Sequence, residues 1–238
     1  MPRKPKSEAE HIAKARKAVL NAALPHVVFD GWSARLLAAA ITDSGVDAGL
    51  AALAFPRGER DLALAFHYDG DDAMQAAMAT TDLAAMRYKD RVVRAIELRL
   101  EFAAAHKEAV RRSMAFFALP QYAADGAGAI WHTADAIWAA LGDTSRDINW
   151  YTKRMTLSAV YSACVLFWLG DESADMADTR AFINRRIEDV MRFEKSKAAF
   201  RASGFGKAWA AGPGKLFEQV RAPEPQTDMP GYTGKETE

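Results

Sequence analysis

The amino-acid sequence predicts an all-α fold, arranged as one large domain or two small ones. Alanine, the best helix former, makes up about a fifth of the 238 residues. Apolar residues recur at three- and four-residue steps through long segments, which is the spacing of one face of an α-helix. Glycine and proline cluster at a few places instead of recurring at the short intervals typical of β-proteins. We therefore expect a series of helices and no β-sheet.

The beginning of the chain has the pattern of a helix-turn-helix. The spacing predicts a helix over residues 8–29, and Ser33 is a suitable N-cap for a second helix that stops at Gly45. Asp47 follows that glycine turn and is expected to cap a short third helix. Two short helices joined by a glycine turn make residues 1–56 a helix-turn-helix region.

Residues 57–194 are expected to form a larger helical domain. A fourth helix begins near residue 58, and the run Tyr-Asp-Gly-Asp-Asp at 68–72 is a candidate break in it. Amphipathic segments follow at 82–104, 106–118, 122–141, 147–170 and 175–202. The segment 147–170 is apolar nearly all round, which is typical of a central core helix. The alternative is that it also lines an apolar cavity, and the sequence leaves both interpretations open.

The composition excludes several classes of protein. Charges balance, with 31 Lys and Arg against 31 Asp and Glu. A single cysteine, Cys164, excludes an internal disulfide and a thiolate zinc site. The longest stretch without a charge, 155–170, is 16 residues long, and a membrane-spanning helix needs roughly 20. The first residues lack the apolar core of a secretory signal. We expect a protein that is soluble or lies on a membrane surface.

No motif in the sequence argues for an enzyme, a metal site or a cofactor. Glu8 and His11 match one half of a di-iron carboxylate motif, but the sequence has no second copy. The acidic run at 69–72 lacks the ligand spacing of a calcium loop. Three further histidines sit in unrelated segments: His67, His106 and His132. Phosphate-binding glycine loops and serine nucleophile elbows are absent from the sequence. The prediction is a non-enzymatic protein with no metal and no cofactor.

A helix-turn-helix commonly reads DNA, but this one is poorly suited to that task. Its would-be recognition helix, residues 47–55, reads DAGLAALAF and has no basic, amide or hydroxyl side chain that could reach a base edge. Its one charged residue, Asp47, is repelled by phosphate. We expect no nucleic-acid partner, and we expect this apolar helix to pack against protein or lipid.

Residues 195–221 combine aromatic and basic side chains. This segment contains six basic residues and one acidic residue, Glu218, a composition suited to an amphipathic helix on anionic lipid. The expected membrane-binding residues are Phe200, Phe205, Lys207, Trp209, Lys215, Leu216 and Phe217. A surface helix or an oligomer contact is the alternative, and Gly-Pro-Gly at 212–214 must break the helix. The acidic tail at 222–238 is rich in proline and glycine and is expected to be disordered.

Two motifs in the second half of the chain resemble a known family. Residues 142–154, Gly-Asp-Thr-Ser-Arg-Asp-Ile-Asn-Trp-Tyr-Thr-Lys-Arg, are similar to the signature of the coenzyme Q biosynthesis protein nine family. Residues 178–186, Asp-Thr-Arg-Ala-Phe-Ile-Asn-Arg-Arg, also resemble that family, and the likeness covers roughly residues 10–195. The order of helices resembles the TetR regulator fold, whose helical second domain encloses a ligand pocket and dimerises.

The resemblance implies an accessory protein of ubiquinone biosynthesis that binds isoprenoid lipid in its helical domain and docks peripherally on a membrane. It implies a homodimer that presents demethoxyubiquinone to the di-iron hydroxylase late in the pathway. The residues carried over as the hydroxylase contact are Asp147, Trp150, Tyr151 and Arg154, a mix that is typical of interface hot spots. Alternatively, these aromatics only anchor the start of a helix to the core. No transit peptide is visible, which points to a bacterial homologue at the inner face of the cell membrane, or to a mature form.

The lipid-binding residues are predicted from the apolar faces of the helices in the second domain. They are Met114, Phe116, Phe117, Ile130, Ile137, Trp138, Leu157, Val160, Tyr161, Leu166 and Phe167. Exposing an isoprenoid tail to water costs about 0.8 kcal/mol per CH₂, so an apolar pocket lowers the barrier to leaving the bilayer. Two alternatives remain, a TetR-type transcriptional regulator with an apolar effector and a dimeric helical scaffold without a ligand.

Overall fold

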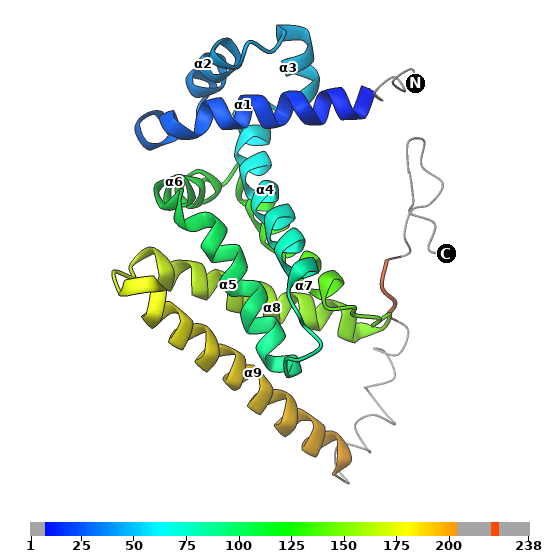
Figure 1. The fold of residues 1–238 in the computed structure, drawn as a ribbon. Coiled ribbons are helices and arrows are strands. Elements are labelled where there is room, and N and C mark those ends of the chain that lie inside the picture. The colour runs from blue at the N-terminus through cyan, green and yellow to red at the C-terminus, as the bar shows by residue number, and fades with distance from the viewer. Residues whose placement is uncertain (1–7, 204–219, 224–238) are drawn as a thin grey trace, which may run out of the picture.

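The computed structural model describes residues 8–203 and 220–223, and these confirm the all-α prediction. Within these ranges the chain forms nine α-helices and one 3₁₀ turn, and no strand. Figure 1 shows two tiers, with α1, α2 and α3 together at one end and the remaining helices in a larger bundle. Helix α4 leads from the first tier into the second (Figure 1).

The N-terminal tier is a helix-turn-helix with the predicted caps. Helix α1 spans Glu8–Asp30, α2 spans Ala34–Ser44 and α3 spans Ala48–Ala54. The Ser33 side chain accepts a hydrogen bond from a backbone N–H of α2 at 3.2 Å, and Asp47 does the same for α3 at 2.9 Å. Gly45 has a φ of 65°, in the left-handed region that glycine enters without a steric cost. Local capping therefore places both short helices where the sequence predicts them.

Helix α4, Glu59–Thr80, is continuous, so the break considered at 68–72 is wrong. Gly70 and Asp71 lie inside the helix and are buried where it packs against the bundle. A Cβ on Gly70 would lie 2.4 Å from a guanidinium nitrogen of Arg99, so glycine is the residue that lets this arginine pass. Asp71 in turn is ion-paired with Arg99. Tertiary contacts therefore hold a turn-like sequence in a helix.

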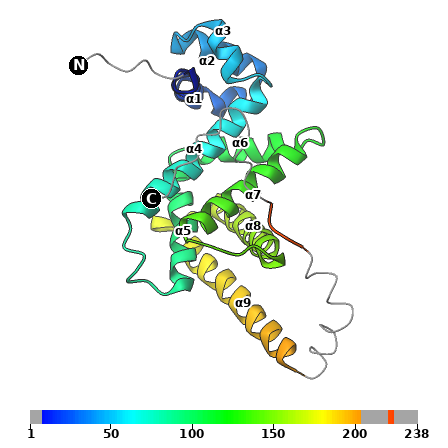
Figure 2. The ribbon, with the colours of Figure 1, turned by 90° about the vertical axis from the view of Figure 1, so that its right-hand side faces the viewer.

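Five helices complete the bundle: α5 (Tyr88–Ala104), α6 (Lys107–Phe117), α7 (Ala123–Ala140), α8 (Ile148–Leu169) and α9 (Ala177–Ala202), the last preceded by a 3₁₀ turn at Ala174–Met176. The sequence predicts that α5 begins at residue 82, six residues before its observed start at Tyr88. The Asp82 carboxylate accepts the N–H of Ala85, and this local hydrogen bond competes with helix formation. Figure 2 shows the C-terminal end of α9 extending beyond the rest of the bundle. The helix continues past residue 194, the domain boundary suggested by the sequence.

Each tier has its own apolar core. The core of the N-terminal tier includes the first half of α4, and Leu20, Leu36 and Leu62 are almost completely buried in it. In the bundle, α8 buries Trp168 and Cys164 against its neighbours. Burial raises the pKa of the Cys164 thiol to about 12, so this cysteine is a small apolar residue of the core. The prediction that α8 is a core helix is confirmed.

None of the helices in the described ranges is long and apolar enough to cross a membrane. Of the predicted membrane-binding residues, Phe200 falls within α9. The others lie outside the described residues: Phe205, Lys207, Trp209, Lys215, Leu216 and Phe217. The tail predicted at 222–238 also lies outside them, apart from Ala222 and Pro223.

Candidate functional site

A cavity lies inside the helical bundle, where α4, α5, α6, α7 and α8 converge, and is named the central cavity below. Its volume is about 280 Å³, near the lower end of the range for small-molecule sites. The polar side chains that line it are His67, Arg99, Ser113, Tyr161 and Ser162. Its other lining residues are small or apolar: Phe66, Leu100, Ala103, Val110, Met114, Phe117, Ala118, Ala123, Gly126, Ala127, Ala129, Ile130, Val165, Leu166 and Trp168.

Five of the predicted lipid-binding residues line the central cavity: Met114, Phe117, Ile130, Tyr161 and Leu166. Tyr161 is almost completely buried, whereas Leu166 is 60% exposed and therefore lies at the mouth. Both residues belong to α8. This helix is thus a core helix and a cavity wall at the same time, and the two interpretations of 147–170 are compatible.

A second cavity, of about 440 Å³, lies mainly between α5, α8 and α9 and is named the lateral cavity. Three predicted lipid-binding residues line it: Trp138, Leu157 and Val160. The lining also includes the charged residues Lys89, Lys153, Glu194 and Lys197, although most of its surface is apolar. The indole N–H of Trp138 is buried and has no hydrogen-bond partner among the described residues.

The remaining three predicted lipid-binding residues line neither of these cavities. Phe116 stacks on Tyr122, with ring centroids 4.3 Å apart. Phe167 stacks on Phe182 at the same distance, and Ile137 is fully buried in the core. Helical spacing identifies an apolar face, but it does not distinguish a packed side chain from one that faces a cavity.

A buried polar cluster borders the central cavity. It consists of His67 and Asp71 on α4, Arg99 on α5, and His132 and Thr133 on α7, and is named the cavity cluster. Asp71 Oδ1 accepts hydrogen bonds from Arg99 Nε at 2.8 Å and from Thr133 Oγ1 at 2.9 Å. Asp71 Oδ2 accepts from His132 Nδ1 at 2.8 Å. Arg99 Nη2 donates to the backbone carbonyl of His67 at 2.9 Å. Three helices are thereby joined through one carboxylate.

The contacts of His67 fix its tautomer. Its Nε2 lies 2.9 Å from the carbonyl oxygen of Ala129 and 2.8 Å from Thr133 Oγ1. Because a carbonyl only accepts, Nε2 carries the proton, and Nδ1 is a bare acceptor when the ring is neutral. Burial and the positive charge of Arg99 lower the pKa of His67 to about 4, so the ring is neutral at pH 7.

The cavity cluster also keeps its ion pair charged. Burial opposes ionisation of Asp71, but the hydrogen bond from His132 and the neighbouring positive charges outweigh it and lower the pKa of Asp71. The same hydrogen bond raises the pKa of His132, which is half exposed. Asp71 is 0% exposed and Arg99 is 4% exposed. Among the described residues, Arg99 is the one cationic side chain in the lining of the central cavity, and a buried carboxylate neutralises it.

The sequence interpretation missed the cavity cluster and treated His67 and His132 as unrelated. They come together because α4 packs against α7, a tertiary contact that residue spacing does not reveal. One local signal was present, since His67 and Asp71 are four residues apart and share a face of α4. Within the described ranges, no group of three or more His, Cys, Asp or Glu residues is placed to hold a metal ion.

The predicted partner-binding residues lie at the start of α8. Asp147 caps the helix, because its Oδ1 accepts the backbone N–H of Asn149 at 3.0 Å. The rings of Trp150 and Tyr151 are 4.8 Å apart in an edge-to-face arrangement, and both pack against Trp131 of α7. These three half-buried aromatic side chains are named the Trp150 patch. They form a continuous aromatic surface.

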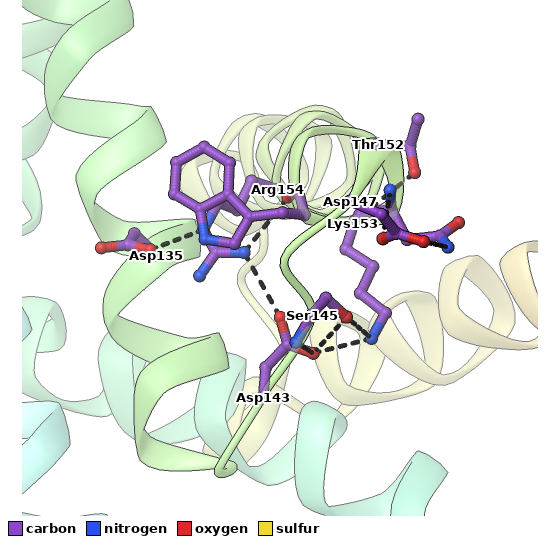
Figure 3. A network of polar contacts seen from close by, with 9 residues as sticks. Asp135, Asp143, Ser145, Asp147, Thr152, Lys153 and Arg154 are labelled. Atoms are coloured by element: carbon purple, nitrogen blue, oxygen red, sulfur yellow. Dashed lines mark hydrogen bonds and ion pairs between the residues drawn. The ribbon is translucent and has the colours of Figure 1, made fainter. Parts of the chain in front are cut away.

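Arg154 lies beneath the Trp150 patch, with about 5% of its side chain exposed. Its guanidinium carbon is 4.0 Å from the centre of the Trp150 ring. Arg154 also pairs with Asp135 at 2.5 Å and with Asp143 at 3.3 Å, and Lys153 reaches the same Asp143 at 2.7 Å (Figure 3). The structure thus brings the four predicted residues together, and Arg154 supports Trp150 from below.

Residues 220–223 return to this part of the molecule. The N–H of Ala222 donates to the carbonyl oxygen of Arg146 at 2.9 Å, and the hydroxyl of Tyr151 donates to the carbonyl oxygen of Arg221 at 3.3 Å. Residues 221 and 222 therefore lie beside the Trp150 patch.

Comparison with known proteins identifies relatives along most of the chain. The COQ9 family model matches residues 123–194, which span α7, α8 and much of α9. The mitochondrial ubiquinone biosynthesis protein COQ9 of Homo sapiens is 27% identical over 78% of this chain and 60% of its own length. The protein of the same name in Drosophila melanogaster is 28% identical over 75% of this chain and 56% of its own. The matched region is thus less than two thirds of the length of these relatives.

A solved structure supports the fold. The TetR transcriptional regulator from Nitrosomonas europaea superposes with a TM-score of 0.58 and 18% sequence identity, over 73% of this chain and 95% of that one. The predicted TetR-like arrangement of helices is confirmed. The family resemblance expected from the motifs at 142–154 and 178–186 is also confirmed, because this chain is similar to the COQ9 ubiquinone biosynthesis proteins over most of its length.

Proposed function

We propose that this chain is an accessory protein of ubiquinone biosynthesis, which binds an isoprenoid lipid intermediate in its central cavity and presents it to the demethoxyubiquinone hydroxylase. The names of its relatives support the pathway. The protein would supply binding and presentation and leave the chemistry to the hydroxylase. Transfer of a long isoprenoid tail between bilayer and enzyme needs such a step, since each exposed CH₂ costs about 0.8 kcal/mol in water.

The observation that carries the proposal is the apolar central cavity. Protein interiors are close-packed, and voids larger than a water molecule are few, so about 280 Å³ of space bordered by apolar side chains is suited to an apolar ligand. The lateral cavity is larger, but Lys89, Lys153 and Lys197 lie in its wall. Each amine is already paired with a carboxylate, and a hydrocarbon tail beside these pairs would remove part of their remaining hydration, so we assign the lipid to the central cavity.

The Trp150 patch is the surface that suits the hydroxylase. Trp and Tyr are enriched at the centres of protein interfaces because they bury a large area with few rotatable bonds. Trp150 and Tyr151 remain partly exposed, and the Arg154 guanidinium holds the indole in place. A rigid aromatic pair loses little conformational entropy when a partner covers it.

The segment 195–221 would hold the protein on the membrane. Its aromatic and basic composition supports this. The described residues at 220–223 lie beside the Trp150 patch, so the end of the membrane segment and the partner surface are neighbours. A hydroxylase bound to the patch would then meet the lipid at the membrane surface.

Mass spectrometry of lipids extracted from the protein, purified from its native host, tests the lipid-binding proposal. We expect isoprenoid quinone intermediates to co-purify with the native chain. Ser162→Phe should fill the central cavity and abolish the bound lipid, whereas Thr156→Phe, a matched change in the lateral cavity, should leave it in place. Circular dichroism would verify that both variants fold.

An empty cavity in the native protein, or a soluble polar metabolite in it, would contradict the proposal. Salt-dependent DNA binding would then be the next measurement, because a TetR-type regulator is the alternative. The surface of α3 argues against that alternative, since Leu53 is 59% exposed on a helix made of Ala, Gly and Leu.

A homodimer is part of the proposal. Helix α8 carries exposed apolar side chains away from the cavity mouth at Met155, which is 61% exposed, and at Phe167, which is 37% exposed. Exposed apolar side chains on one helix favour a protein contact. Light scattering on the purified chain would measure the mass directly, and a monomer at micromolar concentration would contradict this part of the proposal.

A further inference from the structure

We propose that the lateral cavity is a second ligand site, which binds an anionic single-chain amphiphile of the fatty-acid type. The site is separate from the central cavity, because it lies mainly between α5, α8 and α9 and the two cavities share no lining residue. The inference goes beyond the proposed function, since it adds a ligand of different charge and shape.

The lateral cavity is elongated along the helices that enclose it. Its lining runs from Asn149 to Val160 on α8 and from Ile187 to Lys197 on α9. At a rise of about 1.5 Å per residue, each stretch is about 16 Å long. A volume of about 440 Å³ spread over that length makes a narrow channel. This shape suits an extended alkyl chain better than a ring system.

The wall of the lateral cavity is apolar and deeply buried on three helices. Val92 of α5, Leu157 of α8 and Ile187 of α9 are at most 6% exposed. Water is a poor occupant of such a space, because a buried water molecule needs two to four polar partners. An alkyl chain would fill the space and regain the dispersion contacts that an empty void forfeits.

One buried polar atom beside this wall lacks a partner. Trp138 lines the cavity and is 9% exposed, and its indole N–H has no hydrogen-bond partner among the described residues. Buried donors in native proteins are nearly always paired. An oxygen atom of a ligand would supply the missing acceptor, whereas a pure hydrocarbon would not. The orphaned donor therefore favours a ligand that carries an oxygen group.

The charged side chains of the lining favour a negative head group. Lys89, Lys153 and Lys197 come from three different helices. Among the lining residues that the structure describes, the one acid is Glu194. Amines are hydrogen-bond donors without acceptor capacity, and their bonds to a carboxylate are charge-assisted. Three amines around one apolar channel thus suit a chain that ends in a carboxylate.

The ion pairs of Lys89 and Lys197 can be exchanged for a ligand. Lys89 pairs with Glu188 at 2.9 Å and Lys197 with Glu194 at 2.6 Å. The amines are 24% and 27% exposed, whereas the carboxylates are 55% and 47% exposed. Pairs this close to the surface contribute little to stability, and a half-exposed glutamate can turn into water. A neutral tail would only dehydrate these pairs, whereas a ligand carboxylate keeps the amine paired.

Binding of the fluorescent fatty acid cis-parinaric acid to the full-length protein tests this inference. Laurate and its uncharged methyl ester carry the same chain and compete with the probe. We expect laurate to displace the probe at an about tenfold lower concentration than methyl laurate, the equivalent of one charge-assisted hydrogen bond. Dodecyltrimethylammonium, a cation with a chain of the same length, should displace it least.

Cavity-filling variants locate the site. Thr156→Phe should fill the lateral cavity and abolish the preference for laurate over methyl laurate. Ser162→Phe, the matched change in the central cavity, should keep that preference. A preference that is kept in folded Thr156→Phe or lost in folded Ser162→Phe would overturn the second site.

Variants of the amines test the head group. Lys89→Met combined with Lys197→Met should lower the affinity for laurate to that for methyl laurate, which itself should change little. Lys17→Met is the control, because Lys17 is also paired with a carboxylate, that of Asp69, but belongs to α1 in the other tier. An unchanged preference for laurate in the double variant would overturn the role of the amines.

The outcomes separate this inference from the proposed function. Equal displacement by laurate and methyl laurate, or no binding of the probe, would overturn the anionic ligand. The lipids extracted from the native protein test the proposed function independently, so that function would still stand. If Thr156→Phe does not fold, the double lysine variant decides, since both amines belong to pairs near the surface.

Discussion

Two arginines, Arg99 at the central cavity and Arg154 under the Trp150 patch, are equally buried, and each is 4% exposed. Their partners differ. Arg99 pairs with Asp71, which is completely buried, whereas Arg154 shares its charge between Asp143 and Asp135. The Asp143 side chain is 3% exposed but also pairs with Lys153, and the Asp135 side chain is 45% exposed. The other partners and the exposure of each anion, more than the burial of the cation, decide what each arginine does for the protein.

Loss of either arginine leaves a carboxylate behind, and the structure shows how well each is supported. Asp71 would keep the hydrogen bonds from Thr133 and His132 but would lose its close cationic partner inside the bundle. Asp143 would keep its contacts with Lys153 and Ser145, and the partly exposed Asp135 carboxylate would remain hydrated. We therefore expect Arg99 to matter mainly for stability and Arg154 mainly for the shape of a surface.

The largest expected effect follows from Arg99→Met. The variant removes the buried guanidinium that pairs with Asp71 and leaves the half-exposed His132 as its remaining ion-pair partner, so we expect the free energy of unfolding to fall by about 3 kcal/mol. Urea unfolding followed by circular dichroism measures the change. Arg94→Met on the same helix is the control, because Arg94 is 29% exposed and its pairs with Glu97 and Glu101 are near the surface. Its cost should be within about 1 kcal/mol. Similar losses in both variants would contradict the special role of Asp71.

The second prediction concerns pH. The folded pKa of His67 is about 4 against an ordinary value of 6.5, so the unfolded chain binds a proton more readily. The stability that comes from keeping the ring neutral is complete above pH 6.5 and is lost as the pH falls from 6.5 to 4, by about 3 kcal/mol at most. Urea unfolding across this range should show the decline, and His67→Gln should flatten it. An equal slope in the variant would show that another group is responsible.

The third prediction concerns the partner surface. Trp150→Ala should weaken binding of the demethoxyubiquinone hydroxylase by about 2 kcal/mol, or roughly 30-fold, because the aromatic centre of an interface carries much of its binding energy. Bound lipid and the unfolding midpoint should change little, since Trp150 is half-buried. Phe29→Ala removes an aromatic side chain that is 83% exposed in the other tier and should leave hydroxylase binding unchanged. Normal binding by Trp150→Ala would exclude the patch as the contact.

The two regions also differ in how far the sequence predicts them. Two members of the Trp150 patch, Trp150 and Tyr151, are adjacent in the chain, so a motif at 142–154 identifies them, and the caps at Ser33 and Asp47 place the helix-turn-helix in the same local way. The third member, Trp131, comes from α7 and lies outside the motif. The cavity cluster is assembled from three helices. No spacing along the chain connects His67 with His132, and the turn-like run at 68–72 lies inside α4, where Gly70 and Asp71 pack against Arg99.

The residues predicted to bind lipid are an intermediate case. Helical periodicity identified the apolar faces, and eight of the predicted residues line one of the two cavities. It could not separate Tyr161, in the central cavity, from its neighbour Val160, in the lateral cavity, because both sit on the apolar side of α8. Which apolar residue borders empty space depends on the side chains of other helices.

The smallest expected effect on stability comes from Arg154→Met. Asp143 keeps Lys153 as a partner and Asp135 is partly solvated, so we expect a loss of about 1 kcal/mol, part of it the cation–π contact with Trp150. The loss in hydroxylase binding caused by Arg154→Met should nevertheless exceed this loss in stability, because the Trp150 ring loses its contact with the guanidinium. A double-mutant cycle with Trp150→Ala distinguishes support from direct contact. If Arg154 acts through the indole, Arg154→Met should add little to Trp150→Ala in hydroxylase binding, whereas additive losses would mean that the guanidinium itself touches the partner.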